Sequence, residues 1–136
     1  MKGLYSFHSD IEPRMDKAAV IQELQTLCDA FTALFRCKDI DGMVAYYTKD
    51  CKIITPHENF VNESGTLACL KYFIASGAVD SHLTIDDVEM IDQNYAYITN
   101  RRTITFKDGS KKDGKSFILL KKVDDHWCIH VECLYM

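Results

Sequence analysis

The closing stretch of the chain, residues 126–135, constrains the fold more than any other. Successive side chains on a β-strand point to opposite faces, so an alternating sequence predicts a strand with two unlike sides. The apolar row consists of Trp127, Ile129, Val131, Cys133 and Tyr135. The polar row consists of His126, Cys128, His130 and Glu132, with Leu134 at its end. We expect the apolar row to face the core, and such a strand needs helices packed against it.

The first half of the sequence supplies those helices. Apolar residues recur there at three- and four-residue spacing, which is typical of a helix with one buried stripe. The stripe consists of Val20, Ile21, Leu24, Leu27, Cys28, Phe31, Leu34 and Phe35. The helix is expected to begin near Pro13. Two shorter helices are predicted, one from Ile40 to Thr48 behind an Asp39 cap, and one from Thr66 to Ser76 stopped by Gly77.

The rest of the sequence, outside these three helices, favours strands joined by short turns. A short strand over residues 51–55 ends at Pro56, and a brief extended piece is expected at residues 60–61. Four further strands are predicted over residues 82–91, 95–107, 115–123 and 126–135. Short turns force consecutive strands to pair antiparallel, as a meander. The fold class is therefore α+β: a curved antiparallel meander wrapped around the long first helix, leaving a cup at one end. Residues 1–12 are expected to form a loose arm, and residues 13–136 a single domain.

The composition and charge of the chain limit the classes of partner that it can bind. The chain has 136 residues and a formal net charge of −4, and its densest basic clusters are the Lys111–Lys112 and Lys121–Lys122 pairs. We therefore expect neither nucleic acid nor a membrane surface as partner. The six cysteines form no CxxC pair, and the first fifteen residues contain no apolar signal stretch. These features predict a cytoplasmic protein with free thiols and no cofactor.

Several short motifs, taken in order, resemble those of the nuclear transport factor two-like superfamily. The motifs are Lys38-Asp39, residues 46–51, Ile54-Thr55-Pro56, Gly65, Ala96-Tyr97-Ile98 and residues 124–129. The similarity covers roughly residues 16–135. This superfamily includes SnoaL-like cyclases, ketosteroid isomerase, scytalone dehydratase and the association domain of calcium/calmodulin-dependent protein kinase II.

The resemblance implies a cone-shaped domain with a pocket, which commonly dimerises through the outer face of its sheet. It leaves three functions open. The first is a domain that binds a small hydrophobic ligand and forms a homodimer. The second is a SnoaL-like isomerase, cyclase or dehydratase acting on a hydrophobic carbonyl compound. The third is an oligomerisation module.

The expected site residues follow from the same resemblance. Ketosteroid isomerase-like enzymes carry a base before the proline that ends the first strand, where this chain has Thr55, which cannot act as a base near neutral pH. On the last strand, Val131 and Cys133 occupy positions that carry catalytic His or Asp in some members. Both departures weigh against catalysis.

Other side chains are candidates for the pocket. Tyr47 lies at the end of the second predicted helix, His57 lies in the next loop, and Tyr97 and Arg101 share one face of a long strand. Arg101 could bind a carboxylate or a peptide carbonyl, or it could pair with an acidic residue on the neighbouring strand. The predicted ligand-binding set is Tyr47, Thr55, His57, Tyr97, Arg101, Val131 and Cys133, with Tyr47, His57 and Arg101 as candidate catalytic groups. The polar row of the last strand is straight, so its residues do not converge as metal ligands must, and no metal site is predicted.

Overall fold

The computed structural model of the chain describes residues 16–136, and the predicted arm at residues 1–12 lies outside them. Its elements, in order, are α1 (Lys17–Arg36), α2 (Ile40–Val44), β1 (Tyr47–Ile54), β2 (Asn59–Val61), α3 (Asn62–Ala75), β3 (Ala78–Met90), β4 (Tyr95–Phe106), β5 (Lys111–Val123) and β6 (His126–Tyr135). No helix in this part of the chain is long and apolar enough to cross a membrane.

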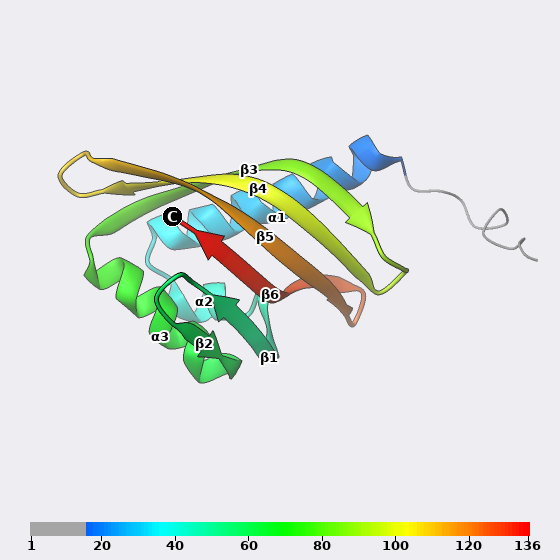
Figure 1. Cartoon of the computed structure of the whole chain (residues 1–136), viewed down its shortest axis with the longest axis horizontal. Helices are drawn as coiled ribbons and strands as arrows, with labels where there is room; N and C mark the ends of the chain where they lie inside the picture. Colours follow the sequence, from blue (N-terminus) through cyan, green and yellow to red (C-terminus); the bar gives the residue numbers. More distant parts are fainter. Residues whose placement is uncertain (1–15) are drawn as a thin grey trace, which may run out of the picture.

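The strands form one six-stranded sheet in the order β2-β1-β6-β5-β4-β3. Strands β3 to β6 are consecutive antiparallel neighbours, so the predicted meander is confirmed. Strand β1 adds to β6 in the parallel direction, which makes the sheet mixed. The long strands curve strongly and the sheet stays open (Figure 1). The α+β class is confirmed.

Helix α1 lies across one face of the curved sheet, as its apolar stripe predicts (Figure 1). Asp16 caps its first turn, because the Asp16 side chain accepts a hydrogen bond from the Ala18 N–H. The buried side chains of the helix are Val20, Leu24, Cys28, Phe31, Thr32 and Phe35. They pack in one core with residues of every long strand, including Ile98, Ile118 and Ile129.

A β-bulge interrupts the pairing of β5 with β6. Leu119 lies opposite Val131, whereas the next residue, Leu120, lies opposite Ile129. His130 is therefore an extra residue without a partner on β5. Because side chains alternate faces, one extra residue exchanges the two faces of the strand beyond it.

The exchange overturns the prediction for three of the five residues in the apolar row, Val131, Cys133 and Tyr135. Trp127 and Ile129, before the bulge, are buried as predicted. Beyond it, Glu132 and Leu134 are the buried residues, each 2% exposed. The prediction that Val131 and Cys133 point inward is wrong, because the sequence alternation was extended through a position where the ladder breaks.

Two helix boundaries also differ from the prediction. Helix α2 ends at Val44 rather than Thr48, and β1 begins at Tyr47, because the backbone there pairs with β6. Helix α3 begins at Asn62 rather than Thr66. Gly65 in its first turn approaches β2 so closely that an added Cβ would lie 2.9 Å from the Phe60 carbonyl carbon. A larger residue there would push α3 away from the sheet.

Helix α1 also covers the exposed edge of the sheet. The Gln25 side-chain amide donates to the Leu83 carbonyl at 2.8 Å and accepts from the Ile85 N–H at 3.1 Å, as a neighbouring strand would. Thr32 donates in the same way to the Ser81 carbonyl at 2.7 Å. Unpaired strand edges invite pairing with other chains, so these contacts protect β3 while holding α1 on the sheet.

Replacing Gln25 by Met tests this edge contact. The variant keeps the volume and helix propensity of the side chain but removes both hydrogen bonds to β3, so we expect a loss of roughly 1–3 kcal/mol in the free energy of unfolding. Urea denaturation measures it. The control is Gln22→Met, the same change at an exposed position of the same helix; equal losses in the two variants would contradict the role given to Gln25.

Candidate functional site

An ion pair lies buried at the centre of the molecule. Arg102 on β4 donates from Nη2 to Oε2 of Glu132 on β6 at 2.7 Å. The Tyr47 hydroxyl, at the start of β1, donates to the other carboxylate oxygen at 3.0 Å. The Glu132 side chain is 2% exposed and that of Arg102 10%. Charges so far from water require such partners.

The strand alternation places Arg102, and not Arg101, inside. Arg102 follows the buried residues Ala96, Ile98 and Asn100 on the inner face of β4. Arg101 points outward, with 63% of its side chain exposed, and pairs with Asp86 on β3 at 2.8 Å. The structure therefore places Arg101 outside the pocket. Its ion pair with the neighbouring strand is the alternative that the sequence left open.

Burial keeps the neighbouring acids protonated. The pKa of the Tyr47 phenol is raised well above its usual value, first by burial and then by the negative charge of Glu132. Burial also raises the pKa of the Cys28 thiol to about 11 and that of the Cys69 thiol to about 12. At neutral pH, Tyr47 is thus a hydrogen-bond donor and both thiols are uncharged.

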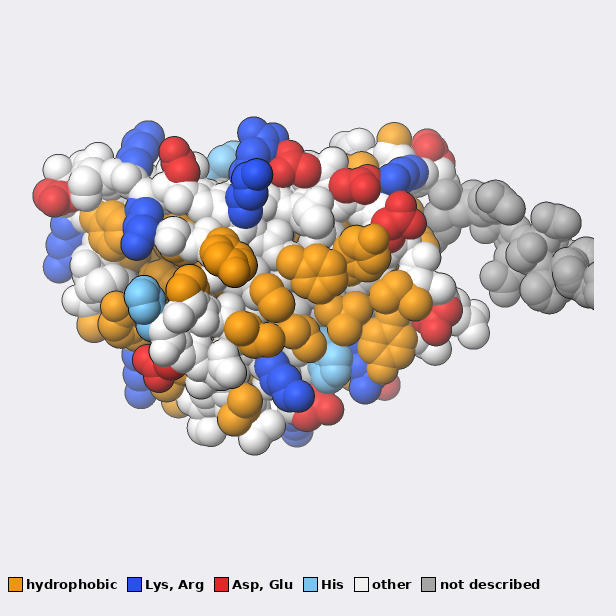
Figure 2. Space-filling view, viewed as in Figure 1, with side chains coloured by type: hydrophobic (Ala, Val, Ile, Leu, Met, Phe, Trp, Pro, Cys, Tyr) orange, Lys and Arg blue, Asp and Glu red, His pale blue; other side chains and the backbone are white. Residues whose placement is uncertain are grey.

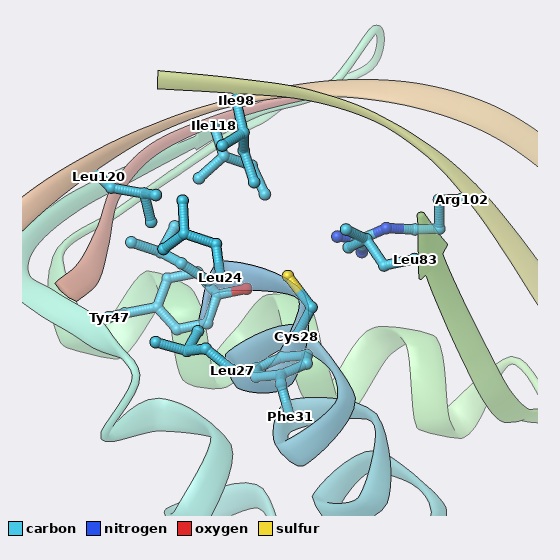
Figure 3. A pocket seen from close by; sticks show the side chains of 11 residues that line it. Leu24, Leu27, Cys28, Phe31, Tyr47, Leu83, Ile98, Arg102, Ile118 and Leu120 are labelled. Carbon is cyan, nitrogen blue, oxygen red and sulfur yellow. The ribbon is translucent and has the colours of Figure 1, made fainter. Parts of the chain in front are cut away.

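Two small interior cavities adjoin the ion pair, each of about 20 Å³, which is room for one water molecule. Phe31, Tyr47 and Arg102 line both of them. The first lies between α1 and the sheet, where the guanidinium of Arg102 and the hydroxyl of Tyr47 point toward one another (Figure 3). Within the protein, Arg102 Nε is buried without a hydrogen-bond partner.

A larger pocket of about 320 Å³ lies between α3, the β1–β2 turn and the ends of β4 and β6. We call it the mouth pocket. It is lined by Thr55, Pro56, His57, Glu58, Phe60, Tyr72, Phe73, Ser76, Ile104, Phe106, Lys112, Leu134 and Met136. Phe73, Ile104 and Leu134 also line the second interior cavity, so these three side chains form the layer between the mouth pocket and the ion pair.

Two predicted residues lie at the mouth pocket, and one of them has a structural task. The Thr55 hydroxyl donates to the Glu58 carbonyl at 2.7 Å and accepts from the Glu58 N–H at 3.0 Å and the His57 N–H at 3.3 Å. It thereby fixes the turn between β1 and β2. His57 lines the pocket from an exposed position on that turn.

The other predicted residues lie on the outer face of the sheet. Tyr97 packs there against Phe117, with ring centroids 5.1 Å apart, and Val131 and Cys133 lie beside them on β6. The structure therefore gathers Tyr47, Thr55 and His57 toward the interior and the mouth pocket. It separates them from Tyr97, Arg101, Val131 and Cys133. Among residues 16–136, no three His, Cys, Asp or Glu side chains are arranged to hold a metal ion.

Sequence reasoning missed Arg102 and Glu132, although each left a signal. On the long strand, the aliphatic residues Ala96, Ile98 and Ile104 share the parity of Arg102, which identifies its face as the inner one. On the last strand, the apolar Leu134 follows Glu132 on the supposedly polar row. Both signals indicate which face of the strand is buried. On the long strand, the aromatic residues Tyr95 and Tyr97 favour the opposite face.

Comparison with solved structures decides the fold. An NTF-2 like protein of unknown function from Shewanella oneidensis MR-1 superposes with a TM-score of 0.73 and 18% identity, over 83% of this chain and 96% of that chain. The chain has the nuclear transport factor two-like fold. A ketosteroid isomerase-like protein from Erwinia carotovora atroseptica gives 0.68 and 19%, over 88% and 96% of the two chains.

The same fold accommodates proteins named for different roles. A putative calcium/calmodulin dependent protein kinase II association domain from Xanthomonas campestris superposes with a TM-score of 0.70 and 20% identity, over 93% of this chain and 98% of that chain. No family model and no curated protein matches the sequence. The nuclear transport factor two-like fold is thus established by shape, and function must be argued from the site.

Truncating one partner of the ion pair tests its burial. In Glu132→Ala, Arg102 keeps its charge without a counterion, so we expect the free energy of unfolding to fall by roughly 3–5 kcal/mol. The double variant Arg102→Met/Glu132→Leu should recover much of that loss, because it removes both charges. Urea denaturation compares them with Arg101→Met, for which we expect a change within about 1 kcal/mol. An equal response to the losses of Glu132 and Arg101 would contradict the burial of the pair.

Proposed function

We propose that this protein binds a small, largely apolar molecule in the mouth pocket and forms a homodimer through the outer face of its sheet. The observation that carries the binding proposal is the mouth pocket itself. Its volume of about 320 Å³ falls within the range of small-molecule sites.

The lining of the mouth pocket suits such a ligand. Aromatic side chains from three elements, Phe60, Tyr72 and Phe106, supply apolar contact area. Tyr72 is 63% exposed, which is high for an aromatic side chain on a helix and leaves it free to close over a ligand. His57 and Lys112 at the same pocket offer polar contacts that can fix orientation. Binding, rather than catalysis, is favoured by Thr55, whose hydroxyl is engaged in the turn.

Filling the pocket tests the binding proposal. We expect Ser76→Trp to abolish binding of 1-naphthol, because an indole at this exposed end of α3 would occupy the mouth pocket. The matched control is Ala75→Trp, one residue earlier on the same helix and outside the pocket lining. Titrations followed by 1H–15N NMR measure both. Binding that is unchanged in Ser76→Trp would contradict this location.

The dimer proposal rests on an apolar patch on the outer face of the sheet. Register brings its members together: Tyr97, Leu119 and Val131 lie side by side across three strands, as do Thr99, Phe117 and Cys133. We call the apolar members Tyr97, Phe117, Leu119, Val131 and Cys133 the outer patch. Figure 2 shows hydrophobic side chains gathered on this face, which faces away from α1. Contiguous apolar surface of this kind is typical of a protein–protein contact.

A charge at the centre of the outer patch tests the dimer. We expect the unchanged protein to have the mass of a dimer in size exclusion with light scattering, and Leu119→Glu to have that of a monomer, because two buried glutamates would meet near the symmetry axis. Lys107→Glu, in the β4–β5 hairpin away from the patch, serves as the control. A monomer at micromolar concentration before any substitution would contradict the proposal, and a larger assembly would favour an association-domain role instead.

A further inference from the structure

We propose that the ligand of the mouth pocket ends in an uncharged oxygen acceptor, such as an amide carbonyl, which accepts a hydrogen bond from Arg102 Nε. This inference rests on the proposed function and adds the chemical class of the ligand. Three independent features of the interior support it: an unsatisfied donor, the balance of charge, and the position of the second interior cavity.

The unsatisfied donor is the Nε–H group of Arg102. The guanidinium of Arg102 has five N–H groups, and Nη2 is bonded to Glu132 while Nε, nine-tenths buried with its side chain, has no partner in the protein. A buried donor left unpaired is costly, so the site favours any molecule that supplies an acceptor. The adjoining cavities of about 20 Å³ hold one oxygen atom, as a water in the free protein or as the terminal group of a ligand.

Charge balance decides the class of acceptor. The ionised groups facing this space are Arg102 and Glu132, whose charges cancel. The other titratable groups around it are the phenol of Tyr47 and the thiols of Cys28 and Cys69, which stay neutral at pH 7 because burial raises their pKa values. A carboxylate would add a second negative charge beside Glu132 in a space with little water, whereas an amide oxygen adds none.

The route to the donor runs through the layer shared with the mouth pocket. Phe73, Ile104 and Leu134 line both spaces, and Phe73 is the partly buried one, so a turn of its ring toward solvent would join the two spaces. A flexible ligand with an aromatic end can then keep its ring in the mouth pocket while its polar end enters the second cavity. Ile104 and Leu134 come from the sheet, and each is 2% exposed.

A pair of isosteric probes tests the inference. We expect 4-phenylbutanamide to bind roughly tenfold or more tightly than 4-phenylbutanoate, as calorimetric titration would show, because only the amide adds an acceptor without a charge. Arg102→Lys keeps a cation for Glu132 but lacks Nε, so it should bind 4-phenylbutanamide roughly tenfold more weakly while its affinity for 1-naphthol stays the same. A crystal structure of the unsubstituted protein with the amide should place its oxygen within hydrogen-bond distance of Arg102 Nε.

The outcomes separate this inference from the proposed function. Equal or tighter binding of the carboxylate, an unchanged affinity of Arg102→Lys for the amide, or an amide oxygen elsewhere in the crystal would each overturn the inference. Binding of 1-naphthol that Ser76→Trp abolishes would leave the proposed function standing in those cases. Failure of 1-naphthol and both probes to bind would overturn both.

Discussion

The interior of this protein depends on the ion pair between Arg102 and Glu132. Two opposite charges lie away from water, and each is tolerated only because the other, with Tyr47, compensates it. The contact exists because Glu132 faces inward, and Glu132 faces inward because His130 is an extra residue in β6. A single bulge therefore decides whether the core contains a carboxylate or the side chains of Val131 and Cys133. Bulges of this kind recur next to functional sites in curved sheets.

The same geometry links the fold to the proposed binding site. Another bulge, at Asp86, bends β3, and Gln25 and Thr32 hold α1 along the edge of this strand. The helix consequently closes one side of the cone while α3 borders the mouth pocket on the other. The ion pair of Arg102 and Glu132 lies between the two helices, and one layer of side chains separates it from the mouth pocket. The outer face of the sheet is free of helices in the described residues.

Much of this architecture could be predicted from the sequence because it depends on the spacing of apolar residues along each helix and strand. The helical stripe from Val20 to Phe35 and the turns between the later strands are local patterns, and both predictions are confirmed. The helix predicted to reach Thr48 ends early because β1 pairs with β6, a contact distant in sequence. The inward side of β6 was missed for a similar reason: alternation carries no sign of a bulge, so Arg102 and Glu132 went unrecognised while Arg101, Val131 and Cys133 were placed in the pocket.

The register of β5 against β6 is the most direct test of this account. In an NMR spectrum of the isotopically labelled protein, cross-strand nuclear Overhauser effects report which backbone protons are neighbours. The account predicts contacts of Leu119 with Val131 and of Leu120 with Ile129, leaving His130 without a partner on β5. An unbroken ladder, in which Leu120 faces His130 and Lys121 faces Ile129, would contradict it, because a continuous alternation cannot place Ile129 and Glu132 on the same face.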